Sequence, residues 1–205
     1  MPKIVNHDRY RRELLAQCLS LFAEQGFGAV TMRQIAASLS VSTGTLYHYF
    51  PNKESIFVQL VEEYCSKDVA QFFAQAPTAA TTEERLQYVM AFFLHNYGAY
   101  QQQFLIWIDF YQHCQHTGKG SDTVLQQFWQ QTHHQLVAYL QIAPEAVDCL
   151  LTYLDGLLLQ CLYGRGEAEI TRQINAFCQL YARGWVGLGA TAVHRKNVVN
   201  AGGWS

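Results

Sequence analysis

The sequence predicts an all-α protein of about nine helices. Apolar residues recur three and four positions apart through most of the 205-residue chain, whereas no segment alternates convincingly between apolar and polar residues as a strand does. Residues that cap or stop helices separate these periodic stretches. Because 50% of the residues are hydrophobic, the chain has ample material for a buried core.

The first two helices are marked at their ends. A stripe of Leu, Cys and Phe residues predicts a helix over residues 7–24, and Gly26 is expected to end it in the left-handed conformation. Thr31 is placed to cap a second helix, and Gln34, three residues later, completes a capping box. Apolar residues at helical spacing follow over residues 32–39.

The third helix has a polar outer face. Ser42 is placed to cap it, and over residues 43–50 the side chains of Leu46 and Phe50 are expected to face inward. The rest of its surface carries small and hydrogen-bonding residues, namely Thr43, Gly44, Thr45, Tyr47 and His48. In a helix-turn-helix, the second helix lies in the major groove of DNA, where small residues permit close approach to base edges. We therefore expect these five residues and Ser42 to contact DNA.

Three further residues are expected to contact the DNA backbone. Lys53 lies in the first turn of the fourth helix, where its ammonium and the free backbone amides would both favour a phosphate. Thr31 and Arg33 hold the comparable position at the start of the second helix.

The rest of the chain also contains residues that start and stop helices. Pro51 stops the third helix, and Asn52 can cap a long fourth helix that continues to about residue 73. A linker over residues 74–82 follows, and Thr81 with Glu84 forms a second capping box. Further helices are predicted over residues 82–97, 101–116, 122–141, 144–163 and 167–188.

The N-terminal quarter of the chain carries a family resemblance. The run of residues 45–57, preceded by Gly26-Phe27 and Ile35-Ala36, closely resembles the DNA-binding domain of the TetR family of bacterial transcriptional regulators. The resemblance implies a DNA-binding domain followed by a divergent domain for ligand binding and dimerisation, without identifying the ligand. The implied divisions are a helix-turn-helix domain over residues 1–52, a helical effector-binding and dimerisation domain over residues 53–189, and a flexible tail over residues 190–205.

The charge distribution agrees with a small DNA-binding surface. The chain has a formal net charge of −2, but its first 60 residues carry six Lys or Arg against four acidic residues. A mildly basic end and an acidic remainder fit binding at a specific site better than coating of DNA. Arg9, Arg11 and Arg12 are candidates for phosphate or minor-groove contacts, with a solvated helix start as the alternative.

An effector site is implied between the fifth and eighth helices. The candidate residues there are Phe93, Tyr97, Trp107, Tyr111 and Trp129. Trp107 and Tyr111, one turn apart, could stack a flat ligand and give it one hydrogen bond. Few charges occur in these helices, so we expect a small hydrophobic or planar effector. Plain core packing of these aromatic residues is the alternative.

The last two helices are expected to form a homodimer. Their sequence is apolar on more than one face. The residues expected at the interface are those of the run 146–162, which includes Leu158, together with Phe177, Leu180, Tyr181 and Trp185. A dimer also follows from the small size of one helix-turn-helix, because useful specificity needs two half-sites.

The remaining residue types predict no further chemistry. Six cysteines without a CxxC pair, and no targeting or membrane segment, indicate a cytoplasmic protein. His113 and His116 share a helix face, but no histidine pair has the spacing of a known metal motif, so we expect no metal and no cofactor. No nucleophile lies in a recognisable catalytic context, so we expect no catalytic residues and no enzyme.

The leading hypothesis is a ligand-responsive transcriptional regulator, a repressor that its effector releases from a palindromic DNA operator. One alternative is a regulator of the same fold that a protein partner or cysteine oxidation controls. A more distant one is a helical enzyme that shares the fold.

Overall fold

The computed structural model describes residues 7–78, 80–118 and 123–184, and every regular element in these residues is helical. The all-α prediction is therefore confirmed. The described elements are α1 (His7–Gln25), α2 (Met32–Ser38), α3 (Thr43–Tyr49), α4 (Lys53–Gln75), α5 (Thr82–His95), α6 (Tyr97–Thr117), α7 (Thr123–Leu140), α8 (Pro144–Leu159), the 3-10 turn η1 (Gln160–Tyr163) and α9 (Glu167–Gly184).

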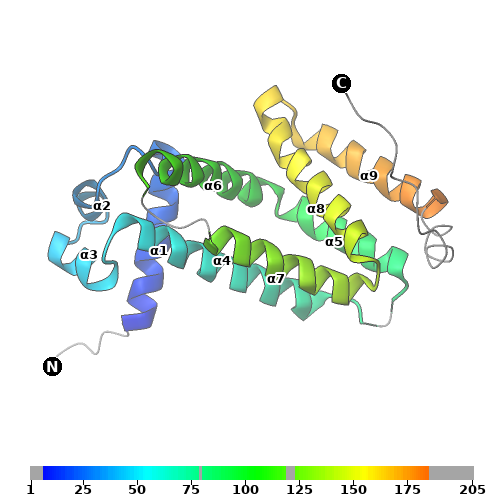
Figure 1. Ribbon diagram of the computed structural model, residues 1–205, viewed down its shortest axis with the longest axis horizontal. Helices are drawn as coiled ribbons and strands as arrows, with labels where there is room; N and C mark the ends of the chain where they lie inside the picture. Colours follow the sequence, from blue (N-terminus) through cyan, green and yellow to red (C-terminus); the bar gives the residue numbers. More distant parts are fainter. Residues whose placement is uncertain (1–6, 79, 119–122, 185–205) are drawn as a thin grey trace, which may run out of the picture.

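The helices form an elongated molecule with two different ends (Figure 1). Helices α1, α2 and α3 gather at one end, and α8 and α9 lie at the other. Between them α4 and α7 run side by side along the long axis, while α6 contacts α1 at one end and α8 at the other. Helices α4 and α6 therefore connect the two ends.

The helix starts follow from the predicted caps. Gln34 N donates to Thr31 Oγ1 at 3.3 Å, and Thr31 N donates back to the Gln34 side chain at 2.9 Å. Thr81 makes the same reciprocal pair with Glu84 at the start of α5, and Asn52 accepts from the amide of the third residue of α4. Each cap satisfies amides that a helix leaves without a partner in its first turn.

The boundary between α5 and α6 differs from the prediction. The sequence placed a break between residues 97 and 101, whereas α6 begins at Tyr97, directly after the single junction residue Asn96. The Asn96 side chain donates to the Phe92 carbonyl at 2.9 Å, which satisfies the end of α5 without a longer loop. The predicted tail over residues 190–205 and the predicted end of the last helix at residue 188 lie outside the described residues.

Two hydrophobic cores fill the molecule, one at each end. The first surrounds Phe27 and Phe57 and also takes in Ile106 and Phe110 of α6. The second contains Met90, Leu140 and apolar residues of α8 and α9. Because the first core draws on α6, the three N-terminal helices do not bury their apolar residues by themselves. The predicted division of the chain at residue 52 remains a prediction.

Candidate functional site

The helix-turn-helix is fixed by hydrogen bonds at the start of α3. Ser42 caps this helix, because Thr45 N donates to Ser42 Oγ at 2.9 Å, and the two hydroxyl oxygens lie 2.8 Å apart. Inside the unit, Ile35 and Leu46 are fully buried, which locks α2 against α3. The turn between them uses Ser40 with a φ of +55°, in the left-handed region. The local pattern thus sets the orientation of α3.

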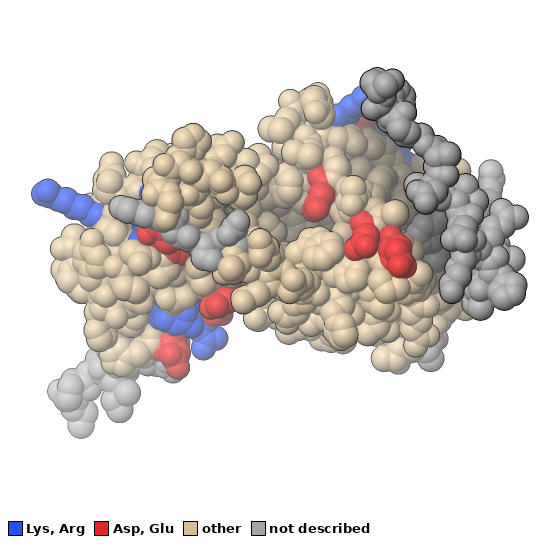
Figure 2. Space-filling view, in the orientation of Figure 1, with Lys and Arg blue, Asp and Glu red and all other residues tan. Residues whose placement is uncertain are grey.

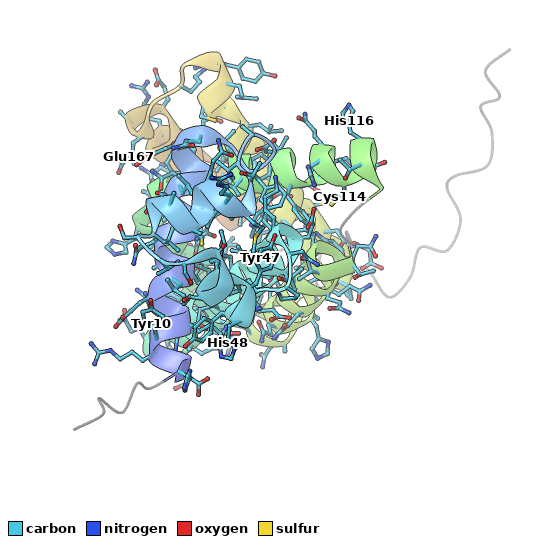
Figure 3. All side chains as sticks on the ribbon, turned by 90° about the vertical axis from the view of Figure 1, so that its left-hand side faces the viewer. Tyr10, Tyr47, His48, Cys114, His116 and Glu167 are labelled. Carbon is cyan, nitrogen blue, oxygen red and sulfur yellow. The ribbon has the colours of Figure 1, made fainter. Side chains whose placement is uncertain are left out.

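The outward face of α3 is open to solvent. Thr43, Gly44, Tyr47 and His48 are exposed, and Thr45 is half-buried. Figure 3 shows Tyr47 near the centre of this end of the molecule, with His48 close to it. All the residues predicted to read DNA from this helix therefore lie on one accessible surface, although DNA contact itself remains a prediction.

A set of aromatic residues behind α3 was not found from the sequence. The His7 Nδ1 atom lies 2.8 Å from the hydroxyl of Tyr49, and the ring of Tyr10 packs edge-on against Tyr49 at 5.6 Å. The ring of His48 lies 5.0 Å from that of Tyr49. These contacts hold the end of α3 against α1. The alternation of Tyr and His over residues 47–49 was the available signal, but it did not reveal the partners on α1.

Arginine residues near this surface have different surroundings. Arg33 on α2 is exposed and makes no hydrogen bond or ion pair with the described residues, so it stays available for a phosphate. Arg11 donates to the side chain of Gln59 at 2.8 Å and lies 3.7 Å from a carboxylate oxygen of Glu63. Arg11 is therefore directed toward α4 and not outward as part of a basic arm.

The ammonium of Lys53 is directed inward. It donates to the carbonyl oxygens of Phe27 at 2.7 Å and Val30 at 2.8 Å, and it lies 4.5 Å from the centre of the Phe27 ring. Its pKa is lowered, chiefly because burial disfavours the charged form, although Glu54 and Asp109 oppose this. In this arrangement Lys53 ties the loop between α1 and α2 to α4. The sequence predicted that this ammonium contacts a DNA phosphate. In the structure it is hydrogen-bonded to backbone carbonyls instead and does not point outward.

The surface charges are sparse. Figure 2 shows a mostly uncharged face, with blue and red groups near one another at the end that carries the helix-turn-helix. In the half that holds α8 and α9, red groups stand apart from blue ones on this face. This pattern agrees with a limited phosphate-binding footprint at one end.

A cavity of about 210 Å³ lies between the helices of the other end. Helices α4, α5, α6, α7 and α8 all contribute to its wall, which is largely aromatic and aliphatic. Trp107 and Phe93 line it, as predicted from the sequence. The exposed residues Phe73 and Asp155 are also part of its lining, so the cavity opens to solvent.

The other three predicted effector residues do not line this cavity. Tyr97 is buried in the second core, and its hydroxyl donates to the Leu157 carbonyl at 3.3 Å. Tyr111 is 49% exposed, because one turn beyond Trp107 helix α6 has passed the cavity. Trp129 is 45% exposed and stacks on His133. These three residues lie away from this cavity, because helical spacing gives a face but not what that face meets, and their contact with an effector remains a prediction.

Several cavity residues were missed by the sequence prediction. The missed aromatic residues are Phe72, Phe73, Phe92, Tyr100, Phe104 and Phe128. Helix α4 contributes Asp68 as well as Phe72 and Phe73, and none of its residues was predicted to line an effector site. The signal available in the sequence was the pair of adjacent aromatic residues 72 and 73 at the end of the apolar stripe of this helix.

The cavity wall contains two carboxyl groups with raised pKa values. Burial raises the pKa of Asp68, with the charge of Lys67 opposing it, and apolar surroundings raise the pKa of Asp155. Burial also raises the pKa of Tyr100, and the nearby Asp68 adds to this effect. The ionised carboxylate of Asp68, which is half-buried, is thus poorly solvated, whereas Asp155 is exposed to solvent.

Helix α6 links the cavity to the helix-turn-helix end. Asp109 accepts a hydrogen bond from the amide of Gly28 at 3.1 Å, in the loop that Lys53 also holds. One turn later, His113 Nε2 lies 3.0 Å from a carboxylate oxygen of Glu54. Between them, the ring of Phe110 stacks on Phe57 with centres 3.6 Å apart. The carboxylate of Asp109 therefore belongs to this contact and is not part of the cavity lining.

Cysteine and metal chemistry find little support in the described part of the chain. Burial raises the pKa of Cys18 to about 12 and also raises the pKa of Cys65, which disfavours the reactive thiolate. None of the six cysteines forms a disulfide. No group of three or more potential metal ligands occurs among the residues that the structure describes.

Comparison with known sequences gives matches concentrated at the N-terminal end. A family profile described as "Bacterial regulatory proteins, tetR family" matches residues 14–60. The HTH-type transcriptional repressor KstR2 of Mycobacterium tuberculosis is 33% identical over 88 residues, which cover 42% of this chain and 44% of that protein. The HTH-type transcriptional regulator BetI of Rhizobium meliloti is 28% identical over 115 residues, or 56% of this chain and 57% of that protein. The chain thus spans about half the length of the curated relatives that it matches.

Solved structures share the fold over most of the chain. A putative transcriptional regulator from Saccharomonospora viridis, in complex with choline, has a TM-score of 0.72 at 19% identity, covering 84% of this chain and 96% of that chain. The structure of KstR2 of Mycobacterium tuberculosis, a ketosteroid transcriptional regulator, has a TM-score of 0.61 at 23% identity, covering 82% and 92%. At such identities the likeness shows a common fold.

Proposed function

The chain belongs to the TetR family of bacterial regulatory proteins, and we propose that it is a ligand-responsive repressor of transcription. In this proposal a homodimer binds a palindromic operator and leaves it when a small molecule fills the cavity. The observation that carries the proposal is the exposed face of α3, whose small and hydrogen-bonding residues stand on a helix held rigidly by its Ser42 cap.

DNA reading is assigned to α3 and phosphate contact to α2. Thr43, Gly44, Tyr47 and His48 face solvent together, as direct contact with base edges requires. Arg33, on the preceding helix α2, supplies an exposed and unpaired guanidinium. Backbone contacts fix register, whereas base contacts give specificity, so the two groups have separable roles.

Dimerisation is assigned to the end of the molecule that holds α8 and α9. The stretch Pro144–Tyr163 is the one described helical segment long and apolar enough to cross a membrane by length and composition alone, yet only 28% of it is buried in the single chain. Leu162, Tyr163 and Leu180 are each more than half exposed. A second copy of the chain would cover this apolar surface. A palindrome also needs two helix-turn-helix units, one from each copy, which are called reading heads below. The predicted interface residues Tyr181 and Trp185 lie outside the part of the chain whose side chains are described.

The cavity is assigned to the effector. Its size, its aromatic wall and its position between five helices support a small-molecule site, and the neighbour from Saccharomonospora viridis holds choline within the same fold. Both α4 and α6 line the cavity and also hold the helix-turn-helix end, through Lys53, Asp109 and His113. A ligand that favours one spacing of these helices would change the distance between two reading heads. A coupling free energy of about 1–3 kcal/mol would be enough for a switch.

The test begins with selection of DNA duplexes from a random library by the purified full chain. We expect enrichment of a palindrome with half-sites about one helical turn apart. Replacing Thr43 by Ala should change the preferred bases, whereas Arg33→Ala should weaken binding to all duplexes and reduce its salt dependence. A library that emerges without any enriched sequence would contradict the proposal.

A further inference from the structure

The charged residues in the cavity lining are all acidic. The lining contains the carboxylates of Asp68 on α4 and Asp155 on α8, and it contains no Lys, Arg or His among the described residues. An anionic ligand placed there would face two negative groups without a positive partner. The cavity chemistry therefore disfavours carboxylate and phosphate effectors.

The two carboxylates also lack partners of their own. Neither Asp68 nor Asp155 makes a hydrogen bond or an ion pair with a described residue. Asp68 is half-buried in the wall, and Asp155 stands at the opening of the cavity. The half-buried carboxylate of Asp68, without a partner, carries a free-energy cost that a bound cation would offset, and the exposed carboxylate of Asp155 adds negative charge at the opening.

The aromatic lining suits the same kind of ligand. Tyr100, Trp107 and six Phe side chains line the cavity together with the two carboxylates. The negative face of an aromatic ring attracts an organic cation, and ammonium groups without N–H bonds are recognised in this way because they need no hydrogen-bond acceptor. The uncharged polar groups of Gln103, Thr132 and Gln135 add limited hydrogen bonding.

We propose that the cavity takes a small organic cation, with its ammonium group held by Asp68, Asp155 and the aromatic wall and its apolar part among the remaining rings. This deepens the effector role given to the cavity above and rests on it. The volume of about 210 Å³ is smaller than the common range of about 300–1,000 Å³ for ligand pockets, so the cation is small. The sequence-based expectation of a hydrophobic or planar effector is thereby narrowed to one with a positive charge.

The experiment compares a cation with its uncharged carbon isostere. Benzyltrimethylammonium and neopentylbenzene have nearly the same shape, and binding of each to the full chain is measured by calorimetry or by tryptophan fluorescence. We expect the cation to bind at least about tenfold more tightly, a factor that corresponds to about 1.4 kcal/mol. The double variant Asp68→Asn with Asp155→Asn should lose this preference and still fold, because Asn keeps the size of the side chain.

Matched controls are available on the same two helices. Glu62 on α4 and Glu145 on α8 are exposed and lie outside the cavity lining, so Glu62→Gln and Glu145→Gln should leave the preference unchanged. Equal binding of the two probes, or no saturable binding of the cation, would overturn the cation proposal. If the double Asn variant prefers the cation as strongly as the wild type does, the role of the two carboxylates is overturned.

A second measurement separates this inference from the proposed function. Release of the selected duplex is followed with each probe. Tight, carboxylate-dependent cation binding without any effect on duplex affinity would support the site and contradict ligand-responsive regulation. Release by the uncharged isostere as efficiently as by the cation would support regulation and overturn the inference about charge.

Discussion

At the scale of single residues, two cations with the same predicted role have different surroundings. Arg33 and Lys53 each lie in the first turn of a helix at the same end of the molecule. Arg33 is free of described partners, whereas the ammonium of Lys53 donates to the carbonyls of Phe27 and Val30. Position in a helix therefore predicts where a side chain starts but not which acceptors it finds.

This difference makes Lys53 a residue for stability. Lys53→Ala should lower the free energy of unfolding by about 2 kcal/mol, because hydrogen bonds from a charged donor are lost and carbonyl groups lose their partner. Arg33→Ala should leave the unfolding free energy within about 0.5 kcal/mol of the wild type and should weaken DNA binding only. Urea denaturation and DNA titration of both variants provide the measurement. Equal stability of the two variants would contradict the inward role of Lys53.

The carboxylate of Asp68, which we propose binds a cation, should lower the free energy of unfolding of the protein without ligand. Because burial raises its pKa above the ordinary value, the folded protein holds the proton more tightly than the unfolded chain does. The ionised group therefore destabilises the fold at neutral pH, and this effect diminishes as the pH falls through the raised pKa. We expect Asp68→Asn to be more stable than the wild type at neutral pH, with the difference shrinking in mildly acidic buffer. A variant that is less stable at neutral pH would show that the carboxylate has a stabilising partner.

At the scale of helices, α6 joins the cavity to the reading head. Its cavity residues, from Tyr100 to Trp107, are followed within two turns by Asp109, Phe110 and His113, which contact the loop after α1 and the start of α4. Gly26 in that loop has a φ of +82°, and a Cβ atom built there would lie 3.2 Å from a carboxylate oxygen of Asp109. The close approach of the loop to α6 thus depends on this glycine.

The link can be tested by removing its carboxylate. Asp109→Ala should lower the unfolding free energy by about 1 kcal/mol, because the Gly28 amide loses its acceptor. Affinity for the selected duplex should fall as well, since the loop next to α2 is no longer held against α6. Gln112→Ala, an exposed change on the same helix, is the control and should change neither quantity. Unaltered duplex affinity in Asp109→Ala would show that α6 does not position the head through this contact.

At the scale of the whole molecule, the apolar surface near α8 and α9 stays exposed to solvent in a single chain. The sequence singled out Leu158 for the interface, but this residue is only 7% exposed and lines the cavity. Leu162 and Leu180 are 63% and 70% exposed and are better tests of an interface. A polar substitution at Leu158 would disturb the core and could not be interpreted.

We expect Leu162→Asp combined with Leu180→Asp to convert a dimer into a folded monomer. A charge placed in a buried apolar interface is strongly unfavourable, whereas the same charge on a free surface is tolerated. Leu105→Asp, at an exposed leucine on α6, is the matched control and should remain dimeric. Light scattering at micromolar concentration gives the mass and circular dichroism checks the fold. A monomeric wild-type protein would rule out the dimer and with it the two-headed reading of DNA.

The sequence alone determined the helical class, the helix caps and the outward face of α3. These features are local, since caps and amphipathic faces depend on residues three or four positions apart. The family resemblance over residues 45–57 is local too, because it rests on one short run of sequence. The structure bears out Thr31, Ser42, Asn52 and Thr81 as caps.

Only the tertiary structure decided which residues meet across the molecule. It placed Trp107 in the cavity and left Tyr111 outside, although the two lie one turn apart, and it brought Asp68 and Asp155 to one cavity from positions 87 residues apart in the chain. It also gave Lys53 carbonyl partners more than 20 positions away. Helical periodicity defines a face, but what a face contacts depends on how five helices pack, and that is a property of the whole chain.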